Sequence, residues 1–262
     1  MKVFYCVLEP HDFLFFSSYD QSKLGITETR IHDIALTYAM NYKGRALDTE
    51  KIPKYEEDLA NMNIYVTPAR LISKIDPETV EMTYNAVDDA SISTESIKEW
   101  TKRDQTFNIP SSGSYIKLAP NSFPISSRYA KNKFEFYAFT MDNNKPRSVI
   151  RIGKKGCIAR IISKELSYEV RTATKDNPIV PTHLINPLAI DTSKVELQKF
   201  HAIRIPPCSL IDHAQISGEF MYAKEKDISH YIVNHNLSKL GANTIVPSGI
   251  TDTKQSMLGM WC

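Results

Sequence analysis

The 262-residue chain lacks the cysteine patterns of secreted and metal-binding proteins. Its four cysteines are widely separated and no Cys-x-x-Cys pair occurs, so neither a zinc site nor a thioredoxin-like motif is indicated. So few cysteines in so long a chain also argue against a disulfide framework. We therefore expect reduced, mostly buried thiols at Cys6, Cys157, Cys208 and Cys262, as is usual in a cytoplasmic protein.

Long hydrophobic segments are also missing. The apolar run at residues 3–8 ends at Glu9 and is too short for a signal peptide, and no cleavage site follows it. No stretch approaches the ~20 apolar residues that a membrane-spanning helix requires. We therefore expect no membrane association and a cytoplasmic location.

The chain has no excess of charge of one sign. It carries 32 Lys and Arg against 30 Asp and Glu, so a nucleic-acid partner would require basic groups clustered on one face. No phosphate-binding P-loop, serine-nucleophile motif or histidine pair with metal-ligand spacing is present, and we predict no cofactor, metal site or catalytic residue. The ordinary hydrophobic content, 42%, indicates a globular chain with a substantial core.

The apolar pattern predicts a mainly β chain with one clear helix. Residues 3–8 form a continuous apolar run, which is typical of a central strand. Between residues 29 and 42 apolar side chains recur at helical spacing, with Thr27 or Thr29 as the expected cap and Gly44 at the end. The residues of this predicted apolar face are Ile31, Ile34, Ala35, Tyr38, Ala39 and Tyr42.

Strand-like segments fill most of the remaining sequence. A hairpin is expected over 148–162 with its turn at 153–156, and a weaker second helix over 94–103. The other expected strands lie at 64–67, 80–87, 115–118, 134–141, 200–205, 218–223 and 230–233. This α+β order is compatible with a ferredoxin-like βαββαβ core that carries a β-rich insertion. The polar, glycine-spaced tail at 241–262 is expected to be partly mobile.

Two parts of the sequence resemble a known family. The first is LEPHDFLFFSS at residues 8–18, followed by IHDIALTYA at residues 31–39. The second is a series of shorter segments, YVTPA at 65–69, RIGKK at 151–155 and NPL at 186–188. In this order they are similar to landmarks of the Csc-one family, the Cas-five-type subunit of type I-D CRISPR–Cas Cascade. The resemblance extends over about the first 222 residues.

The resemblance implies a RAMP-superfamily fold, which is a modified ferredoxin-like (RRM-like) domain with an inserted β-rich thumb. We accordingly expect a single domain over residues 1–240, with the thumb within 62–133. It also implies a non-catalytic subunit that binds the 5′ handle of the crRNA and contacts a Cas-seven-type backbone subunit and a Cas-ten-type large subunit. Through the assembled complex, such a subunit takes part in crRNA-guided recognition of foreign target DNA.

The candidate RNA contacts combine cations with flat side chains, because single-stranded RNA offers phosphates and exposed bases. Glycines in the 153–156 turn would let a basic hairpin approach a phosphate closely. Of the three phenylalanines after the first strand, we expect two in the core and one available for stacking, with the neighbouring serines suited to phosphate oxygens. The predicted RNA-binding residues are Phe15, Phe16, Ser17, Ser18, Arg30, Arg147, Arg151, Lys154, Lys155 and Arg160.

Two alternatives remain open from the sequence. His32 lies early in the predicted helix, where related repeat-cutting nucleases keep a catalytic histidine, and Arg30 and Lys23 would be the accompanying cations of an endoribonuclease. In the simpler interpretation, His32 orders the helix start or pairs with Asp12 or Asp33. The other alternative is a protein–protein adaptor whose basic side chains only face solvent.

Overall fold

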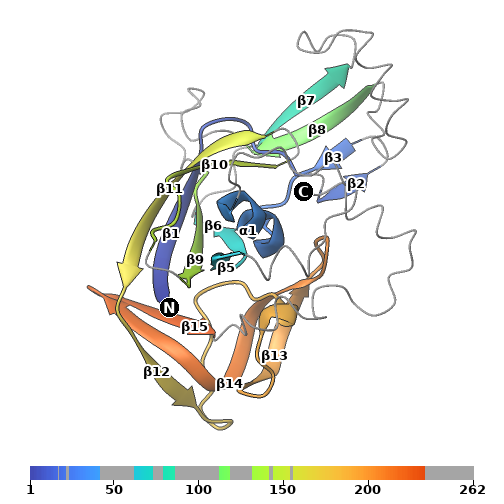
Figure 1. The fold of residues 1–262 in the computed structure, drawn as a ribbon. Helices are drawn as coiled ribbons and strands as arrows, with labels where there is room; N and C mark the ends of the chain where they lie inside the picture. The colour runs from blue at the N-terminus through green and yellow to red at the C-terminus, as the bar shows by residue number, and fades with distance from the viewer. Residues whose placement is uncertain are drawn as a thin grey trace.

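The computed structural model describes residues 1–16, 18–21, 24–41, 62–72, 79–85, 112–118, 132–141, 144–153 and 156–233 (Figure 1). Strands dominate this part of the chain, which contains one α-helix, α1 (Asp33–Asn41), and one short 3-10 helix, η1 (Pro187–Ala189). No helix in these ranges has the length and apolar character needed to cross a membrane.

The largest sheet, here the main sheet, has seven strands in the order β10-β11-β1-β9-β6-β4, with β5 also paired to β9. These strands are β1 (Lys2–Pro10), β4 (Arg30–Ile31), β5 (Ile64–Val66), β6 (Ala69–Leu71), β9 (Phe134–Thr140), β10 (Val149–Ile152) and β11 (Cys157–Leu166). The first strand lies between β11 and β9 and is antiparallel to both, which confirms the predicted central strand.

Both faces of the main sheet are used for packing. Side chains of β1 alternate between two buried clusters, with Phe4 and Cys6 in one and Val3 in the other. The first cluster also contains Leu36 and Met40 of α1, so the helix covers that face. This alternation follows from the period of two in a β-strand.

The helix was predicted in the right place but with the wrong start and, in part, the wrong face. It begins at Asp33 and not at residue 29, because Arg30 and Ile31 pair with β6 as strand β4. Leu36 and Met40, outside the predicted apolar face, are fully buried. The ring of His32, and neither Thr27 nor Thr29, lies at the helix start, with Nδ1 3.3 Å from the backbone N of Ile34. Tyr42 and Gly44 lie outside the described residues.

A second sheet covers part of the opposite face of the main sheet (Figure 1). It has the order β12-β14-β13, with β15 also paired to β14. Its strands are β12 (Tyr168–Ala173), β13 (Val195–Ile203), β14 (Leu210–Glu225) and β15 (Ile228–Val233). Met221 and Ile232 of this sheet pack with Val3 and Phe139 of the main sheet. The covered end of the main-sheet face is therefore a packing surface and not an open platform.

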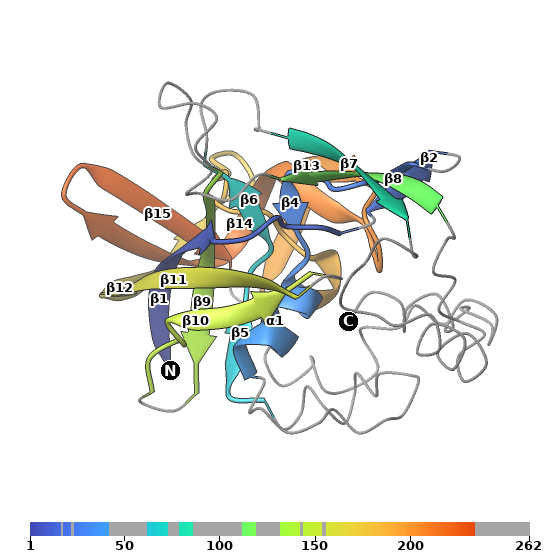
Figure 2. The same cartoon turned by 90° about the horizontal axis from the view of Figure 1, so that it is seen from above.

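A third sheet, with the order β2-β3-β8-β7, joins two distant parts of the sequence (Figure 2). It consists of β2 (Tyr19–Gln21), β3 (Leu24–Ile26), β7 (Thr79–Asn85) and β8 (Ser112–Leu118), with β3 and β8 parallel. Both β7 and β8 fall within the range predicted for the thumb, whereas β5 and β6, also in that range, belong to the main sheet. The thumb boundaries stay a prediction.

The main sheet has the connectivity of the first half of a ferredoxin-like unit. The chain passes from β1 through α1 to β5 and β6, and β9 then lies between these strands and β1. On the other side of β1 lies the β10–β11 hairpin, and the described residues between β9 and β10 contain no helix. The described part of the chain is thus mostly β with a curled sheet, and within it the complete βαββαβ order is not present. The predicted helix at 94–103 and the tail at 241–262 lie outside the described residues.

Candidate nucleic-acid interface

The β10–β11 hairpin forms with its turn where the sequence predicted it. Gly153 and Gly156 have φ angles of +81° and +63°, a left-handed conformation that favours glycine. The turn is closed by a hydrogen bond of 3.0 Å from the backbone N–H of Gly156 to the carbonyl oxygen of Gly153. Lys154 and Lys155, between these two glycines, lie outside the described residues.

Two predicted RNA-binding arginines share one face of this hairpin. Arg151 is opposite Ile158 and Arg160 is opposite Val149 in the strand register, and all four side chains are exposed. Arg147 is also exposed, just before β10 begins. The exposed face of the hairpin therefore alternates cations with aliphatic side chains.

The hairpin arginines have few partners of their own. Arg151 donates one long hydrogen bond, 3.4 Å, to the carbonyl oxygen of Gly156. Neither the Arg147 side chain nor the Arg160 side chain has a hydrogen bond or ion pair with any residue that the structure describes. Their positive charges are therefore available to an external anion.

The hairpin turn packs directly on the segment after β1. A Cβ atom added to Gly153 would lie 2.7 Å from the carbonyl oxygen of Phe15, so only glycine allows this approach. The backbone N–H of His11 donates to the carbonyl oxygen of Ile158 over 2.8 Å, and the Cys157 thiol donates to that of Asp12, 145 residues away in sequence. The structure thus brings together two regions that the sequence singled out separately.

The aromatic side chains of this segment point mainly into the core. Phe15 and Phe16 are only 2% and 8% exposed, while Phe13 is half-buried. Two of the three phenylalanines therefore serve the core, as expected, and Phe13 is more exposed than the two predicted to bind RNA. The side chain of Ser18 is buried, and its hydroxyl oxygen accepts a 3.1 Å hydrogen bond from the backbone N–H of Glu28. Ser17 lies outside the described residues.

Arg30 lies apart from the hairpin arginines. It belongs to β4, the edge strand opposite β10 in the main sheet, and pairs with Glu28 over 3.4 Å. The segment between β1 and β3 extends toward it, since the backbone N–H of Phe16 donates to Thr27 Oγ1 over 3.1 Å. The segment after β1 thus contacts the hairpin at one end and Thr27, three residues before Arg30, at the other.

His32 is held in a buried ion pair with its sequence neighbour. Its Nδ1 atom lies 2.8 Å from Asp33 Oδ1, and its Nε2 atom lies 3.2 Å from the carbonyl oxygen of Cys208. Burial alone would lower the pKa of His32, but the Asp33 carboxylate and Cys208 raise it to about 10. The ring is therefore an imidazolium at neutral pH. Of the simpler roles, pairing with Asp33 is confirmed.

This placement does not suit the general base of a nuclease. A general base needs an unprotonated nitrogen that reaches the substrate, and His32 is 5% exposed with both ring nitrogens engaged. Among the described residues, moreover, no group of three His, Cys, Asp or Glu side chains is placed to hold a metal ion.

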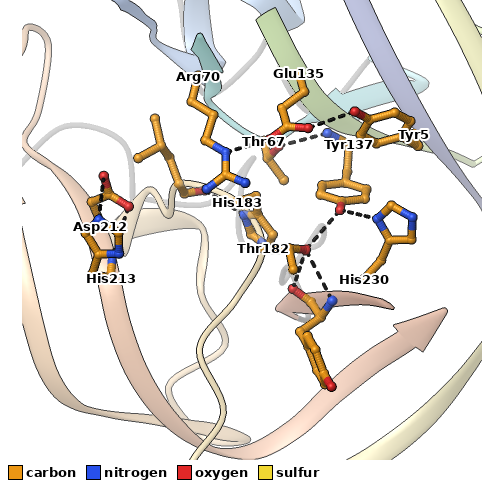
Figure 3. Close-up of polar contacts among 12 residues, drawn as sticks. Tyr5, Thr67, Arg70, Glu135, Tyr137, Thr182, His183, Asp212, His213 and His230 are labelled. Atoms are coloured by element: carbon orange, nitrogen blue, oxygen red, sulfur yellow. Dashed lines mark hydrogen bonds and ion pairs between the residues drawn. The ribbon is translucent and has the colours of Figure 1, made fainter. Parts of the chain in front are cut away.

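Sequence reasoning missed a polar network between the main sheet and the second sheet (Figure 3). The Tyr137 hydroxyl lies 2.7 Å from His230 Nδ1 and 2.9 Å from Thr182 Oγ1. Burial raises the pKa of Tyr137 to about 12 and lowers the pKa of His230, so both groups are neutral at pH 7. No sequence signal reveals this contact, because the three residues lie in separate segments.

A neighbouring part of Figure 3 shows charges on the main sheet that are paired. Glu135 accepts one hydrogen bond from Arg70 Nε and one from the Tyr5 hydroxyl, each 2.7 Å long. Burial, followed by the contact with Glu135, raises the pKa of Tyr5. These residues hold β6, β9 and β1 together, and the Arg70 guanidinium compensates the negative charge of Glu135.

The fold described above, mostly β with a curled sheet and a helix on one face, is compatible with the RAMP-type fold of Cas-five-type proteins. The family model of the type I-D CRISPR-associated protein Cas5/Csc1 matches residues 1–240, and the chain belongs to this family. Family membership supports a role as a subunit of the type I-D Cascade complex. The resemblance recognised in the sequence is thereby confirmed. A comparison with curated proteins gives no match.

Proposed function

We propose that this chain is a non-catalytic Cascade subunit that binds the 5′ handle of the crRNA and contacts the Cas-seven-type backbone subunit and the Cas-ten-type large subunit. The observation that carries the proposal is the exposed face of the β10–β11 hairpin. There, Arg147 and Arg160 have no ionic partner among the described residues, and the turn packs on the segment after β1. The same complex would bring the chain to target DNA.

The chemistry of this face suits single-stranded RNA. Guanidinium groups bind phosphate oxygens in a bidentate manner, and the aliphatic side chains between them offer apolar contact to riboses and splayed bases. Lys154 and Lys155 belong to the same hairpin and add charge to it. We further propose that RNA reaching Arg30 follows the segment at residues 11–18, because this segment connects the hairpin to the region of β4.

The buried position of His32 supports the non-catalytic assignment. An imidazolium paired with Asp33 cannot take a proton from a 2′-hydroxyl group, which is the step that metal-independent cleavage requires. The thumb, proposed within 62–133, would provide the contact with the backbone subunit.

A charge-reversal experiment tests the RNA contact. The double variant Arg151→Glu/Arg160→Glu is compared with the matched variant Lys199→Glu/Arg204→Glu, which changes two exposed cations that lie on β13 or just after it. Binding of a labelled 5′-handle RNA is measured by fluorescence anisotropy, for the isolated chain and for the assembled complex, over a range of salt concentrations. Both variants change the net charge equally, so only a local contact separates them.

The hairpin variant is expected to lose at least tenfold in affinity. The slope of log K against log salt concentration should also become shallower by about 1.4, since each lost phosphate contact on a single strand accounts for about 0.7. The matched variant should bind like the wild-type chain. Equal binding by all three proteins would contradict the proposal and leave the adaptor role. Cleavage of repeat RNA by the wild-type chain, lost in His32→Ala, would contradict the non-catalytic assignment.

A further inference from the structure

A buried polar cluster joins the start of α1 to two later parts of the chain. It contains His32 and Asp33 from the helix start, Asn186 from the cap of η1, and Cys208 from the turn between β13 and β14. The Asn186 side-chain amide donates to both Asp33 carboxylate oxygens, over 3.1 and 2.9 Å. RNA binding as proposed above makes no use of this cluster.

The three ionisable members are arranged as a nucleophile, a histidine and an orienting carboxylate. Cys208 Sγ lies 3.3 Å from His32 Nε2, and Asp33 Oδ1 lies 2.8 Å from the other ring nitrogen. This order of contacts is the one that activates a thiol, because a cationic imidazole stabilises the thiolate and the carboxylate holds the ring in place. Asn186 in turn holds the Asp33 carboxylate in position through its two hydrogen bonds.

The protonation state of His32 favours this interpretation over a simple structural contact. Two atoms approach Nδ1, the Asp33 carboxylate oxygen at 2.8 Å and the backbone N of Ile34 at 3.3 Å. The carboxylate is the nearer of the two, and the raised pKa of His32 keeps the ring cationic through neutral pH. Nε2–H then donates toward Cys208, which offers its carbonyl oxygen at 3.2 Å and its sulfur at 3.3 Å. The competing contact, from the Cys208 thiol to Asn186 Oδ1, is longer at 3.5 Å.

The other described cysteines have no such surroundings. Cys6 and Cys157 are buried, and burial raises the pKa of both thiols, that of Cys157 to about 11. Cys157 donates to the backbone carbonyl of Asp12 and has no imidazole beside it. Cys208 is only partly buried, in contrast to Cys6 and Cys157.

We propose that Cys208 is a reactive thiol, a modification site for low-molecular-weight disulfides such as glutathione disulfide. The Cys208 thiolate attacks one sulfur of the disulfide, the S–S bond breaks, and one glutathione leaves as a thiolate. The product is a mixed disulfide at Cys208, and no other oxidant or reductant is consumed.

The first test compares the folded chain with a peptide of residues 203–213, which has the same local sequence but lacks His32. Both are incubated with glutathione disulfide at pH 6.0 and pH 8.0, and the initial rate of mixed-disulfide formation at Cys208 is followed by mass spectrometry of unreduced peptides. An unassisted thiol with a pKa of about 8.5 slows about 75-fold between these pH values, as its thiolate fraction falls.

In the folded chain the rate at Cys208 is expected to fall less steeply than in the peptide over the same interval. Within the described residues, Asp33 and Cys208 are the ionisable groups that act on His32, and His32 stays cationic from pH 6 to 8. A decline as steep as that of the peptide would overturn the proposal. This measurement needs no variant and therefore does not depend on a mutant folding.

A second measurement assigns the effect to His32. The variant His32→Gln, checked by circular dichroism, should give the steep pH profile of the peptide at Cys208. A profile that stays flat in the folded variant would show that His32 does not activate the thiol. RNA binding is not measured in either test, so failure here and failure of the proposed function are separate results.

Discussion

Two groups of arginines lie on the same face of the main sheet and differ in what surrounds them. Arg70, on β6, has a carboxylate partner in Glu135, which also accepts from a tyrosine. Arg151 and Arg160, on the hairpin at the other edge, have no carboxylate partner among the described residues. All three residues are arginines, so the two regions differ in whether a carboxylate lies within reach of the guanidinium group.

The same contrast appears one strand away from the hairpin. Glu9 is opposite Arg160 in the register of β1 and β11, but its carboxylate pairs with Lys133 over 2.6 Å. Exposed ion pairs contribute little to stability, typically 0–1 kcal/mol, so leaving a hairpin cation unpaired costs the fold almost nothing. What the unpaired cations retain is the capacity to bind an external anion. A nearly neutral protein can in this way carry a local basic surface.

The buried pair of His32 and Asp33 differs most from the exposed hairpin arginines, because a buried cation needs a counter-charge. The variant Asp33→Asn should destabilise the chain by about 3–5 kcal/mol, because it leaves a buried cation without its counter-charge. Urea unfolding at pH 7 measures the loss. The exposed replacement Asp176→Asn is the control and should change the free energy of unfolding by less than about 0.5 kcal/mol.

The pair also gives the wild-type chain a pH-dependent stability. The pKa of His32 is about 10 in the folded chain against 6.5 for the unperturbed group, so its contribution is complete below pH 6.5 and is lost as the pH rises toward 10. In Asp33→Asn this decline between pH 7 and 9.5 should be much smaller. An equal decline in both proteins would assign it to other groups.

A smaller effect is expected where the hairpin meets the segment after β1. Gly153→Ala should destabilise by about 2–3 kcal/mol, because the new Cβ would lie 2.7 Å from the backbone oxygen of Phe15. Gly156→Ala is a matched control in the same turn. It also has a positive φ, but its Cβ would meet only an arginine nitrogen at 3.8 Å, so we expect about 1 kcal/mol.

Thermal unfolding of the two glycine variants distinguishes the contact from general strain in the turn. Gly153→Ala should also weaken binding of the 5′-handle RNA more than Gly156→Ala does, since it displaces the hairpin from residues 11–15. Equal stability and equal RNA affinity of the two variants would show that the close approach has no role.

The smallest effect on stability is expected at the unpaired cations. Arg151→Gln and Arg160→Gln should each change the free energy of unfolding by less than about 0.5 kcal/mol, because no described ion pair is lost. Chemical denaturation measures this change. A loss above 1 kcal/mol would mean that these arginines stabilise the fold, and the contrast with Arg70 would then no longer hold.

The sequence predicted those features that depend on local pattern. The central strand at β1 and the hairpin with its glycine turn appear where alternation and turn residues placed them. Pairing of His32 with Asp33 was one of the roles that the sequence left open for His32, and the structure shows this pair. The start of α1 was not predicted correctly. Residues 30–31 form strand β4 because they pair with β6, which lies almost 40 residues later in the sequence.

Contacts between distant segments escaped sequence reasoning altogether. The approach of Cys208 to His32 spans 176 residues, and the contact between Tyr137 and His230 spans 93. The periodicity of a single sequence does not indicate such pairings, because they depend on how the sheets pack against each other. The same limit applies to Arg30, which shares a predicted function with the hairpin but lies at the opposite edge of the sheet.

The position of β1 at the centre of the main sheet has a consequence for synthesis of the protein. This apolar strand is made before both of its neighbours, β9 and β11, which end only at residues 140 and 166. At translation rates of about 5–20 residues per second, roughly 10–30 s pass between the synthesis of β1 and the completion of both partner strands. During that interval its unpaired edges are exposed to other chains. Production of this subunit should therefore be sensitive to chaperones that protect β1 while its partners are being made.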